Sequence, residues 1–233
     1  MFSHDMLAAS MRFEFKVWCA KWWAKSKRSR HFLRKVRGVI HVGANSGQER
    51  LLYNELGLEV IWIEPVPATF ERLRANLEEF PKQHAYRYLI TDEDDREYVF
   101  HISNNEAASS SILPIAKHKQ MWPDVEYTDA ITLTSSTLNT FVNRERVNLQ
   151  KFQALILDTQ GSELLILRGA SMVLPEMRFV KVEVPDFESY AGCCQLAQMS
   201  EFMSSAGFRE CRREPFMSLQ GVGTYYDVTY ECR

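Results

Sequence analysis

The sequence predicts an α/β fold with a mostly parallel sheet, helices on both faces and a closing antiparallel strand pair. From Gly38 onward, short apolar runs alternate with segments of helical periodicity, which is typical of successive βαβ units. The first apolar run, residues 39–42, leads directly into the glycine-containing turn GANSG. Near the end of the chain, residues 209–213 and 224–230 are two extended segments joined by a loop, which predicts the antiparallel pair.

The expected elements follow from the apolar periodicity and from the positions of Gly and Pro. Strands are expected at residues 39–42, 59–63, 85–90, 97–102, 131–133, 152–157, 178–184, 209–213 and 224–230, and helices at residues 48–56, 68–80, 138–143, 162–173 and 196–206. The strand at residues 97–102 is an addition to a minimal doubly wound sheet. Residues 104–130 are rich in small polar residues, so they predict a long loop, with at most a short helical turn, that serves as a lid or a substrate loop.

The composition indicates a globular protein of the reducing cytoplasm. The 233 residues are 45% hydrophobic, which is enough for one substantial core with an appendage. The sequence has no apolar run of roughly 18 residues, as a membrane span requires, and its start lacks the pattern of a secretory signal. The five cysteines are odd in number and form no CxxC pair, so no disulfide framework or zinc site is expected.

Charge is distributed unevenly along the chain. Residues 1–38 contain ten Lys or Arg but only two acids, whereas the rest contains 18 basic and 28 acidic residues. We therefore expect a basic amphipathic helical extension at residues 1–37 and the main domain at residues 38–233. Apolar residues recur at helical spacing in the extension: Met11, Phe15, Trp18 and Trp22. They either pack on the main domain or lie on an anionic membrane surface, and nucleic acid is the least favoured partner, because charge alone gives no base readout.

The turn after the first strand has the features of a ligand-binding turn. In open α/β sheets, ligands bind outside the carboxyl ends of the strands. Gly43 allows the turn, Asn45 offers a short amide, and Gly47 lets the next helix begin close to a ligand. The N–H groups at the start of that helix then face a negative group, such as a carboxylate or a phosphate.

Glu64 gives a second indication, because it ends the next strand 21 residues after Gly43. An acid at about this distance from a glycine turn binds a ribose diol. A dinucleotide-binding turn follows the pattern GxGxxG or GxGxxA, which would put a small residue at position 48. This chain has Gln48 there, and its glycine lies one position earlier, at Gly47. This spacing favours S-adenosyl-L-methionine as the nucleoside cofactor, and an NAD-dependent oxidoreductase is the alternative.

The motifs of the chain, taken in order, resemble the FkbM family of class I, S-adenosylmethionine-dependent methyltransferases. The resemblance covers about residues 38–185 and rests on VIHVGANSGQE, WIEPVPATFERLRANL, EAASSSIL, LILDTQGSELLILRGA and VKVEVP. It implies a Rossmann-like seven-stranded sheet with the cofactor at the tips of its early strands.

The resemblance also implies roles for individual residues. The turn residues Gly43, Asn45 and Gly47 are expected to hold the methionine part of the cofactor, and Glu64 the ribose. Asp92, after the third strand, is expected near the adenine, and its alternative is a solvated turn acid. Family members generally methylate hydroxyl oxygens of sugars or secondary metabolites.

His41 is a departure from the family pattern, which usually has an acidic residue at this position. The change weakens any charge-based contact made there with the amino group of the cofactor. On a buried strand, we expect His41 to be a hydrogen-bonded core residue rather than a catalyst.

Three acids are candidates for the catalytic step, in which an alcohol oxygen loses its proton to a carboxylate or a histidine. Asp158 ends one strand, Glu163 lies at the start of the following helix, and Glu183 is near the end of the neighbouring strand. Neighbouring, partly buried carboxylates have raised pKa values. Asp158 is the best candidate for a base or substrate anchor, and Glu163 has the alternative role of stabilising a helix start. No full set of metal ligands accompanies these acids.

The loop contains the candidate substrate residues Ser110, Ser111 and Trp122. The serines either bind a polyhydroxyl acceptor or are solvated, and Trp122 either stacks on a sugar or anchors the loop. The sequence thus predicts an S-adenosylmethionine-dependent O-methyltransferase that acts on a small-molecule or glycan hydroxyl. The alternatives are the oxidoreductase and a non-catalytic nucleoside-binding module recruited to membrane or RNA by residues 1–37.

Overall fold

The computed structural model of the protein describes residues 31–233. The helix expected within residues 1–37 lies outside the described residues, except for the 3-10 helix η1 (Leu33–Lys35). The compact unit that contains both sheets spans Val36–Arg233. The division of the chain at residues 37 and 38 stays a prediction.

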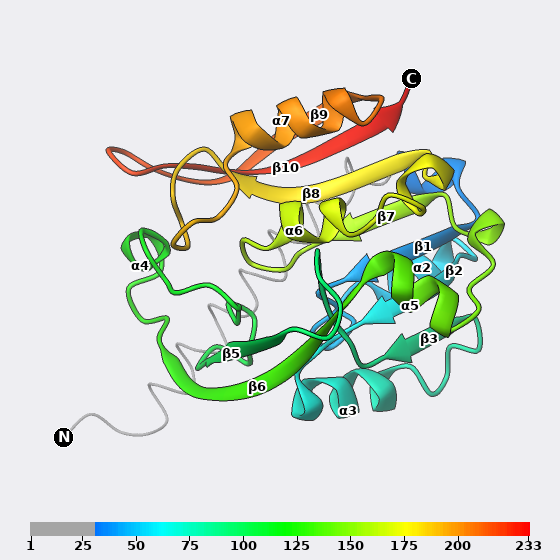
Figure 1. Ribbon diagram of the computed structural model, residues 1–233, viewed down its shortest axis with the longest axis horizontal. Coiled ribbons are helices and arrows are strands. Elements are labelled where there is room, and N and C mark those ends of the chain that lie inside the picture. Colours follow the sequence, from blue (N-terminus) through cyan, green and yellow to red (C-terminus); the bar gives the residue numbers. More distant parts are fainter. Residues whose placement is uncertain (1–30) are drawn as a thin grey trace. The chain divides into compact units, whose positions relative to one another are not determined.

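The main sheet has seven strands in the order β3-β2-β1-β7-β8-β10-β9 (Figure 1). Its strands are β1 (Gly38–Val42), β2 (Glu59–Ile63), β3 (Gln83–Tyr86), β7 (Ala154–Leu157), β8 (Phe179–Pro185), β9 (Phe208–Leu219) and β10 (Gly223–Cys232). All neighbouring pairs are parallel except those of β10, which runs antiparallel to both β8 and β9. The predicted mostly parallel sheet with a closing antiparallel pair is confirmed.

The strand order reverses between β1 and β7. From β1 the chain continues to β2 and β3 on one side, and after β6 it returns to β7 and β8 on the other side. The two tips are joined directly, because the backbone N–H of Asp158 donates a hydrogen bond of 3.0 Å to the carbonyl oxygen of Val42. Ligands of open α/β sheets bind at such a switch point.

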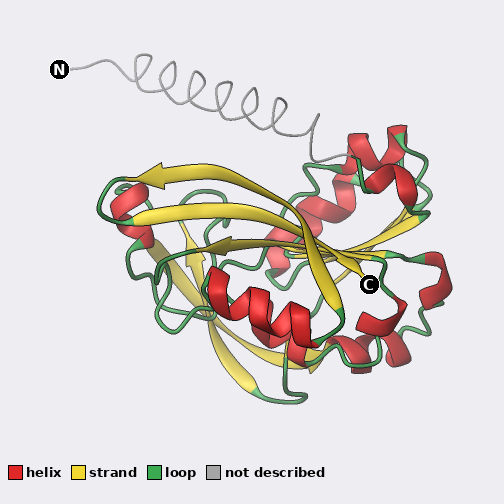
Figure 2. Cartoon of the chain, turned by 90° about the horizontal axis from the view of Figure 1, so that it is seen from above, coloured by secondary structure: helices red, strands yellow, loops and turns green. Residues whose placement is uncertain are grey.

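Helices lie on both sides of the strands (Figure 2). They are α2 (Arg50–Glu55), α3 (Pro67–Asn76), α4 (His118–Met121), α5 (Leu138–Arg144), α6 (Glu163–Arg168) and α7 (Leu196–Ser205), with the 3-10 helices η2 (Leu149–Lys151) and η3 (Leu174–Glu176). In the part of the chain that the structure describes, no helix has the length and apolarity that crossing a bilayer requires.

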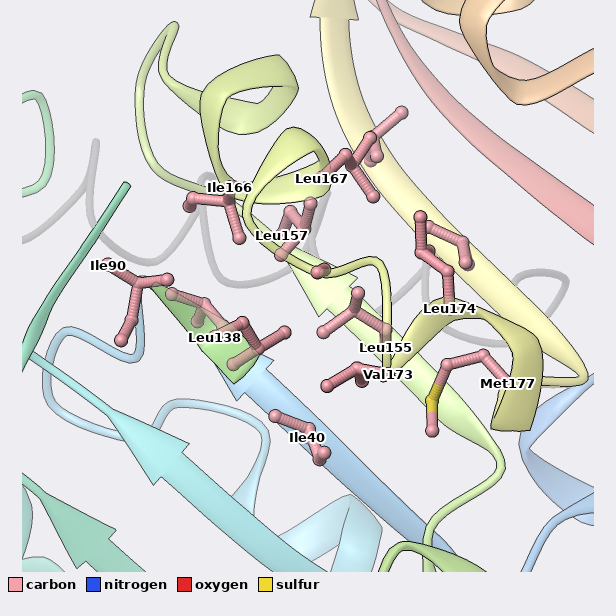
Figure 3. Packing of buried hydrophobic residues seen from close by; sticks show 14 of the residues in the cluster. Ile40, Ile90, Leu138, Leu155, Leu157, Ile166, Leu167, Val173, Leu174 and Met177 are labelled. Atoms are coloured by element: carbon pink, nitrogen blue, oxygen red, sulfur yellow. The ribbon is translucent and has the colours of Figure 1, made fainter. Parts of the chain in front are cut away.

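One face of the main sheet carries the principal hydrophobic core. Alternate strand residues, among them Ile40, Leu155 and Leu157, pack against apolar residues of α5 and α6 such as Leu138 and Ile166 (Figure 3). Because side chains alternate along a strand, the residues between them face the opposite side. That opposite face therefore carries a different set, which includes His41 and Lys181.

A second sheet of three strands, in the order β4-β6-β5, was not expected. Its strands are β4 (Leu89–Thr91), β5 (Glu97–Ser103) and β6 (Tyr127–Thr137). The prediction of one strand at residues 85–90 is wrong: β3 ends at Tyr86 in the main sheet, and β4 pairs with β6. Leu89 packs with Val66 and Phe100 in a small separate cluster, which explains why the chain leaves the main sheet.

The expected helix at residues 162–173 is interrupted at Gly169. A side chain there would overlap the carbonyl oxygen of Thr91, so the close contact between α6 and β4 requires glycine. Helix α2 is also shorter than expected, with six residues from Arg50. The turn that precedes it, rather than a helix N-terminus, therefore follows β1.

Candidate functional site

Gly43 allows the tips of β1 and β7 to touch. Its φ angle is +84°, and a side chain at this position would overlap the carbonyl oxygen of Asp158. Only glycine combines this backbone angle with such a close approach. The close contact that requires glycine at position 43 is thus made with the chain itself.

Gly47 has a similar packing role. Its φ angle is +73°, and a Cβ there would lie 2.8 Å from the Cδ1 atom of Leu73 in α3. The small residue lets the turn pack under α3. The predicted contacts of Gly43 and Gly47 with the methionine part of a cofactor stay predictions.

Asn45 and Glu64 join the tips of β1 and β2. The backbone N–H of Asn45, at φ 44°, donates to Oε2 of Glu64 over 2.9 Å, and the backbone N–H of Val66 donates to Oε1 over 3.0 Å. Burial raises the pKa of the Glu64 carboxyl from 4.5 to about 7, whereas the two N–H groups and Arg72 lower it. Each carboxylate oxygen has capacity for a further hydrogen bond. Glu64 is thus a fixed acceptor between two strand tips.

The long loop is fastened over the glycine turn at Glu106. The carbonyl oxygen of Glu106 accepts hydrogen bonds from Nδ2 of Asn45 at 3.1 Å and from Nη2 of Arg72 at 3.4 Å. Glu106 and Ala107 have φ angles of 57° and 63°. These two residues occupy the left-handed region that non-glycine residues rarely adopt, so specific contacts hold the loop at this edge.

The turn after β7 brings Asp158 and Glu163 together. Asp158 is exposed, and its Oδ1 accepts a hydrogen bond of 2.8 Å from Nε2 of Gln160. Glu163 is buried and accepts from the backbone N–H of Thr159 at 2.8 Å and from that of Gly161 at 3.2 and 3.1 Å. Burial raises the pKa of Glu163 to about 7, and the charge of Asp158 adds to that increase. Glu163 therefore stabilises the turn that contains Asp158. The catalytic role of Glu163 stays a prediction.

Glu183 is half-buried in β8, two residues before the strand ends, and lies opposite Asp227 of β10. Burial raises the pKa values of Tyr190 and Tyr225, and the charge of Glu183 raises them further. Glu183 therefore lies near these two aromatic residues.

Ser110 and Ser111 are buried and hydrogen-bonded within the chain. Oγ of Ser110 accepts from the backbone N–H of Ser103 at 3.0 Å, and Oγ of Ser111 donates to the carbonyl oxygen of Gln160 at 2.8 Å. The alternative of loop solvation is wrong for these two serines, because both are buried and bonded within the chain. Composition alone does not reveal such partners. Their contact with an acceptor stays a prediction.

Trp122 belongs to an aromatic cluster around His118. The rings of Trp122 and His118 stack with centroids 4.5 Å apart, and the ring centroid of Tyr190 lies 4.9 Å from that of His118. This packing fits the alternative in which Trp122 anchors the loop, and its contact with a substrate stays a prediction. Nδ1 of His118 is hydrogen-bonded to the hydroxyl of Tyr225 at 2.8 Å. Burial lowers the pKa of His118 to about 4, so its imidazole is neutral at pH 7.

Gln160 connects the turn, the loop and the aromatic cluster. Its Oε1 accepts a hydrogen bond of 2.8 Å from the hydroxyl of Tyr190, while its carbonyl oxygen binds Ser111 and its amide binds Asp158. Sequence reasoning did not select Gln160 or Tyr190, and it noted His118 only as a loop neighbour of Trp122. The DTQGSE motif contained a signal for Gln160, but the contacts of the other two come from distant segments.

Comparison with known proteins identifies the family. Residues 41–210 match the methyltransferase FkbM domain. The chain belongs to the FkbM methyltransferase family. FkbM methyltransferases use S-adenosylmethionine as methyl donor, so this chain is an S-adenosylmethionine-dependent methyltransferase. No curated protein sequence matches it significantly.

Solved structures share the fold of this FkbM methyltransferase. The 1,6-didemethyltoxoflavin-N1-methyltransferase of Burkholderia thailandensis, solved with bound 1,6-didemethyltoxoflavin and S-adenosylhomocysteine, is similar with a TM-score of 0.50 and 12% identity, over 100% of this chain and 91% of that one. An uncharacterized protein of Listeria monocytogenes serotype 4b has a TM-score of 0.50 and 7% identity, over 84% of this chain and 62% of that one. Together with the sheet order, these similarities confirm the Rossmann-like class I fold.

Asp92 lies elsewhere in the FkbM methyltransferase than expected. It follows β4 of the second sheet and is partly buried beside Gly169, at the end of α6. The main-sheet strand that was predicted to precede Asp92 is β3, which ends at Tyr86. Its location at the tip of the third main-sheet strand is therefore wrong, and its contact with adenine stays a prediction.

His41 is the hydrogen-bonded core residue that the sequence predicted. Its Nδ1 lies 3.2 Å from the hydroxyl of Tyr53, and its ring stacks on Trp62 with centroids 4.8 Å apart. Burial, with a smaller effect of the charge of Lys181, lowers its pKa to about 3. The imidazole is therefore neutral and gives the FkbM site no charge.

Proposed function

We propose that this FkbM methyltransferase methylates a hydroxyl oxygen of a sugar, a glycan or a secondary metabolite in the cytoplasm. The observation that carries the proposal is the position of Asp158. Its carboxylate is exposed immediately after β7, and its backbone contacts Gly43 at the point where the strand order reverses. A hydroxyl must lose its proton during methylation, and a carboxylate at hydrogen-bond distance accepts it.

The residues at this edge fit the cofactor. Glu64 is a buried carboxylate that two backbone N–H groups hold in place, with capacity left for the two hydroxyls of a ribose. In the proposal, Glu64 holds the ribose, the turn of Gly43, Asn45 and Gly47 holds the methionine part, and Asp92 lies on the adenine side. When bound, the cofactor supplies a methyl group on a positively charged sulfur, which is the electrophile.

The acceptor is proposed to bind between the long loop and the tip of β7. The backbone N–H groups of Ala116 and His118 donate to the carbonyl oxygen of Ser189 at 2.9 and 3.0 Å, so the loop is fastened to the segment after β8. The half-buried Trp122 offers an aromatic surface to a planar or sugar ring. Positioning of the hydroxyl accounts for much of the rate in such a reaction.

Asp158 takes the proton in this proposal, and the acceptor oxygen gains the methyl group. Glu183, beside Tyr190 and Tyr225, is the second proton acceptor, whereas Glu163 positions the turn of Asp158. Among residues 31–233, no group of three or more potential ligand side chains suits a metal ion.

Transfer of a trideuteriomethyl group tests the proposal. The protein is incubated with S-adenosylmethionine that carries the labelled methyl group and with a small-molecule extract, and products are analysed by mass spectrometry. We expect a labelled ether that is absent with Asp158→Asn. Label on nitrogen or carbon contradicts O-methylation. Binding of S-adenosylhomocysteine without any transfer indicates the non-catalytic binding module, and binding of NAD alone indicates the oxidoreductase.

An anionic membrane surface is the second proposed partner, through residues 1–37. The ten Lys or Arg of residues 1–38 support it, together with the apolar residues at helical spacing. Full-length protein is expected to sediment with phosphatidylserine vesicles in low salt, and a variant that lacks residues 1–30 is expected not to. Equal sedimentation of the two proteins, or of neither, contradicts this partner.

A further inference from the structure

Glu49 ends the glycine-containing turn and immediately precedes α2. Its carbonyl oxygen accepts the backbone N–H of Tyr53 at 3.0 Å, which fixes its backbone at the start of the helix. Its side chain is partly buried, and the structure records no ion pair with it among residues 31–233. A carboxylate in this setting lacks the counter-ion that a partly buried charge normally has.

Glu49 lies one helical turn before Tyr53, whose hydroxyl is 3.2 Å from Nδ1 of His41, so both side chains lie on the face of the main sheet that carries His41. His41 of β1 lies beside Ile156 of β7, which lies beside Lys181 of β8, and all three occupy the face opposite the principal core. Continuing these rows toward the carboxyl edge reaches Gly43 on β1 and Asp158 on β7. Gly43 has no side chain, and its backbone lies directly against the carbonyl oxygen of Asp158, so the tips of β1 and β7 meet at this point.

Charges around Glu49 are mostly negative. Lys181 of β8 is a cation on this face of the sheet, and its Nζ is 3.3 Å from Oδ1 of Asp227, with which it forms an ion pair. Burial, together with the charges of Asp158 and Asp227, raises the pKa of Glu49 from 4.5 to about 7, against the lowering effects of its backbone hydrogen bond and of Lys181. The charges of Glu49, Asp158 and Asp227 thus all act on the ammonium group of Lys181. A second positive charge would stabilise the ionised form of Glu49.

We propose that Glu49 binds the α-ammonium group of the methionine part of S-adenosylmethionine. The inference rests on the proposed function, which places the methionine part along the turn of Gly43, Asn45 and Gly47. The cofactor carries two cationic groups, and the sulfonium must stay accessible to the acceptor, so the ammonium is the group left for Glu49. The neutral His41 on the same face cannot take this role.

Calorimetric titrations of the full chain test the assignment with two ligands. S-adenosylhomocysteine keeps the ammonium but has no sulfonium charge, and 5′-methylthioadenosine lacks the whole amino acid tail. Glu49→Gln is expected to weaken S-adenosylhomocysteine binding roughly tenfold or more, since hydrogen bonds to charged groups contribute about 1.5 kcal/mol or more. Its affinity for 5′-methylthioadenosine is expected to be unchanged, which also reports that the variant is folded.

Glu55→Gln is the matched control, because Glu55 is an exposed acid in the same helix. It is expected to bind both ligands like the unaltered protein. The inference is overturned if Glu49→Gln binds S-adenosylhomocysteine normally, or if it loses both ligands equally. If the unaltered protein binds neither ligand, the proposed function fails as well. A loss seen with S-adenosylmethionine but not with S-adenosylhomocysteine assigns Glu49 to the sulfonium and contradicts the ammonium contact.

Discussion

The backbone N–H of Asn45 donates a hydrogen bond of 2.9 Å to the carboxylate of Glu64. This bond joins the tips of β1 and β2, which are separate segments of the chain, and it orients the one buried acid that the sequence assigned to a ribose. Both the cofactor proposal and the role of the long loop depend on this junction, because Asn45 also binds the loop through Glu106.

Glu64→Gln is expected to weaken the binding of S-adenosylhomocysteine and 5′-methylthioadenosine by the same factor. The amide keeps one acceptor oxygen and replaces the other with a donor, so one ribose hydroxyl loses its partner, at a cost of about 1 to 3 kcal/mol. Calorimetry measures both affinities, and the exposed Glu78 supplies the control Glu78→Gln. A loss confined to S-adenosylhomocysteine would show that Glu64 contacts the amino acid tail instead.

The carboxyl group of Glu64 makes the stability of the cofactor-free protein depend on pH. Its pKa is about 7 in the folded protein against 4.5 for an ordinary glutamate. The folded state therefore binds more protons between these values, and the free energy of unfolding falls as pH rises from about 4.5 to about 7. Because one pKa unit corresponds to about 1.4 kcal/mol, Glu64→Gln should remove up to about 3 kcal/mol of this fall. Urea unfolding at both pH values measures it, and parallel curves for the two proteins would refute it.

Gly43→Ala is expected to destabilise the protein by more than about 2 kcal/mol. The new methyl group overlaps the carbonyl oxygen of Asp158, and the φ angle of +84° adds strain. Gly57→Ala is the matched control, since Gly57 has φ +69° but no atom within 4 Å of the added Cβ. Its cost should be only about 1 kcal/mol, from backbone strain. Similar losses for the two variants in urea unfolding would argue against the close contact of β1 and β7.

Asp158→Asn and Glu163→Gln are expected to differ in kind. Asp158→Asn should lower label transfer about 100-fold or more while S-adenosylhomocysteine affinity and stability stay unchanged, as for loss of a general base. Glu163→Gln should instead lower the free energy of unfolding, because its carboxylate accepts the N–H groups of Thr159 and Gly161. Transfer assays and urea unfolding of both variants separate the roles. A catalytic loss for Glu163→Gln at full stability would make Glu163 the proton acceptor.

The sequence predicted the main sheet well because its signals are local. Alternating apolar runs and helical stretches, together with the glycine turn after residues 39–42, predict β1, β2 and the helices between the strands. The run at residues 85–90 reads as one strand, and only pairing of β4 with β6, far along the chain, divides it. Asp92 was placed wrongly for the same reason.

The candidate site was predictable only where one segment carries the information. Glu64 and Asp158 were identified from their positions at strand ends. The buried state of Ser111 depends on Gln160, 49 residues away, and that of His118 depends on Tyr225, 107 residues away. Polar composition left open whether Ser111 binds an acceptor or solvent, and long-range packing supplied a protein partner.

A crystal structure with S-adenosylhomocysteine bound tests the central claim most directly. The account predicts both ribose hydroxyls at about 2.5 to 3.0 Å from the carboxylate oxygens of Glu64, with the homocysteine part along the turn of Gly43, Asn45 and Gly47. A nucleoside bound away from the tips of β1 and β2, with Glu64 contacting only Asn45 and Val66, would contradict it.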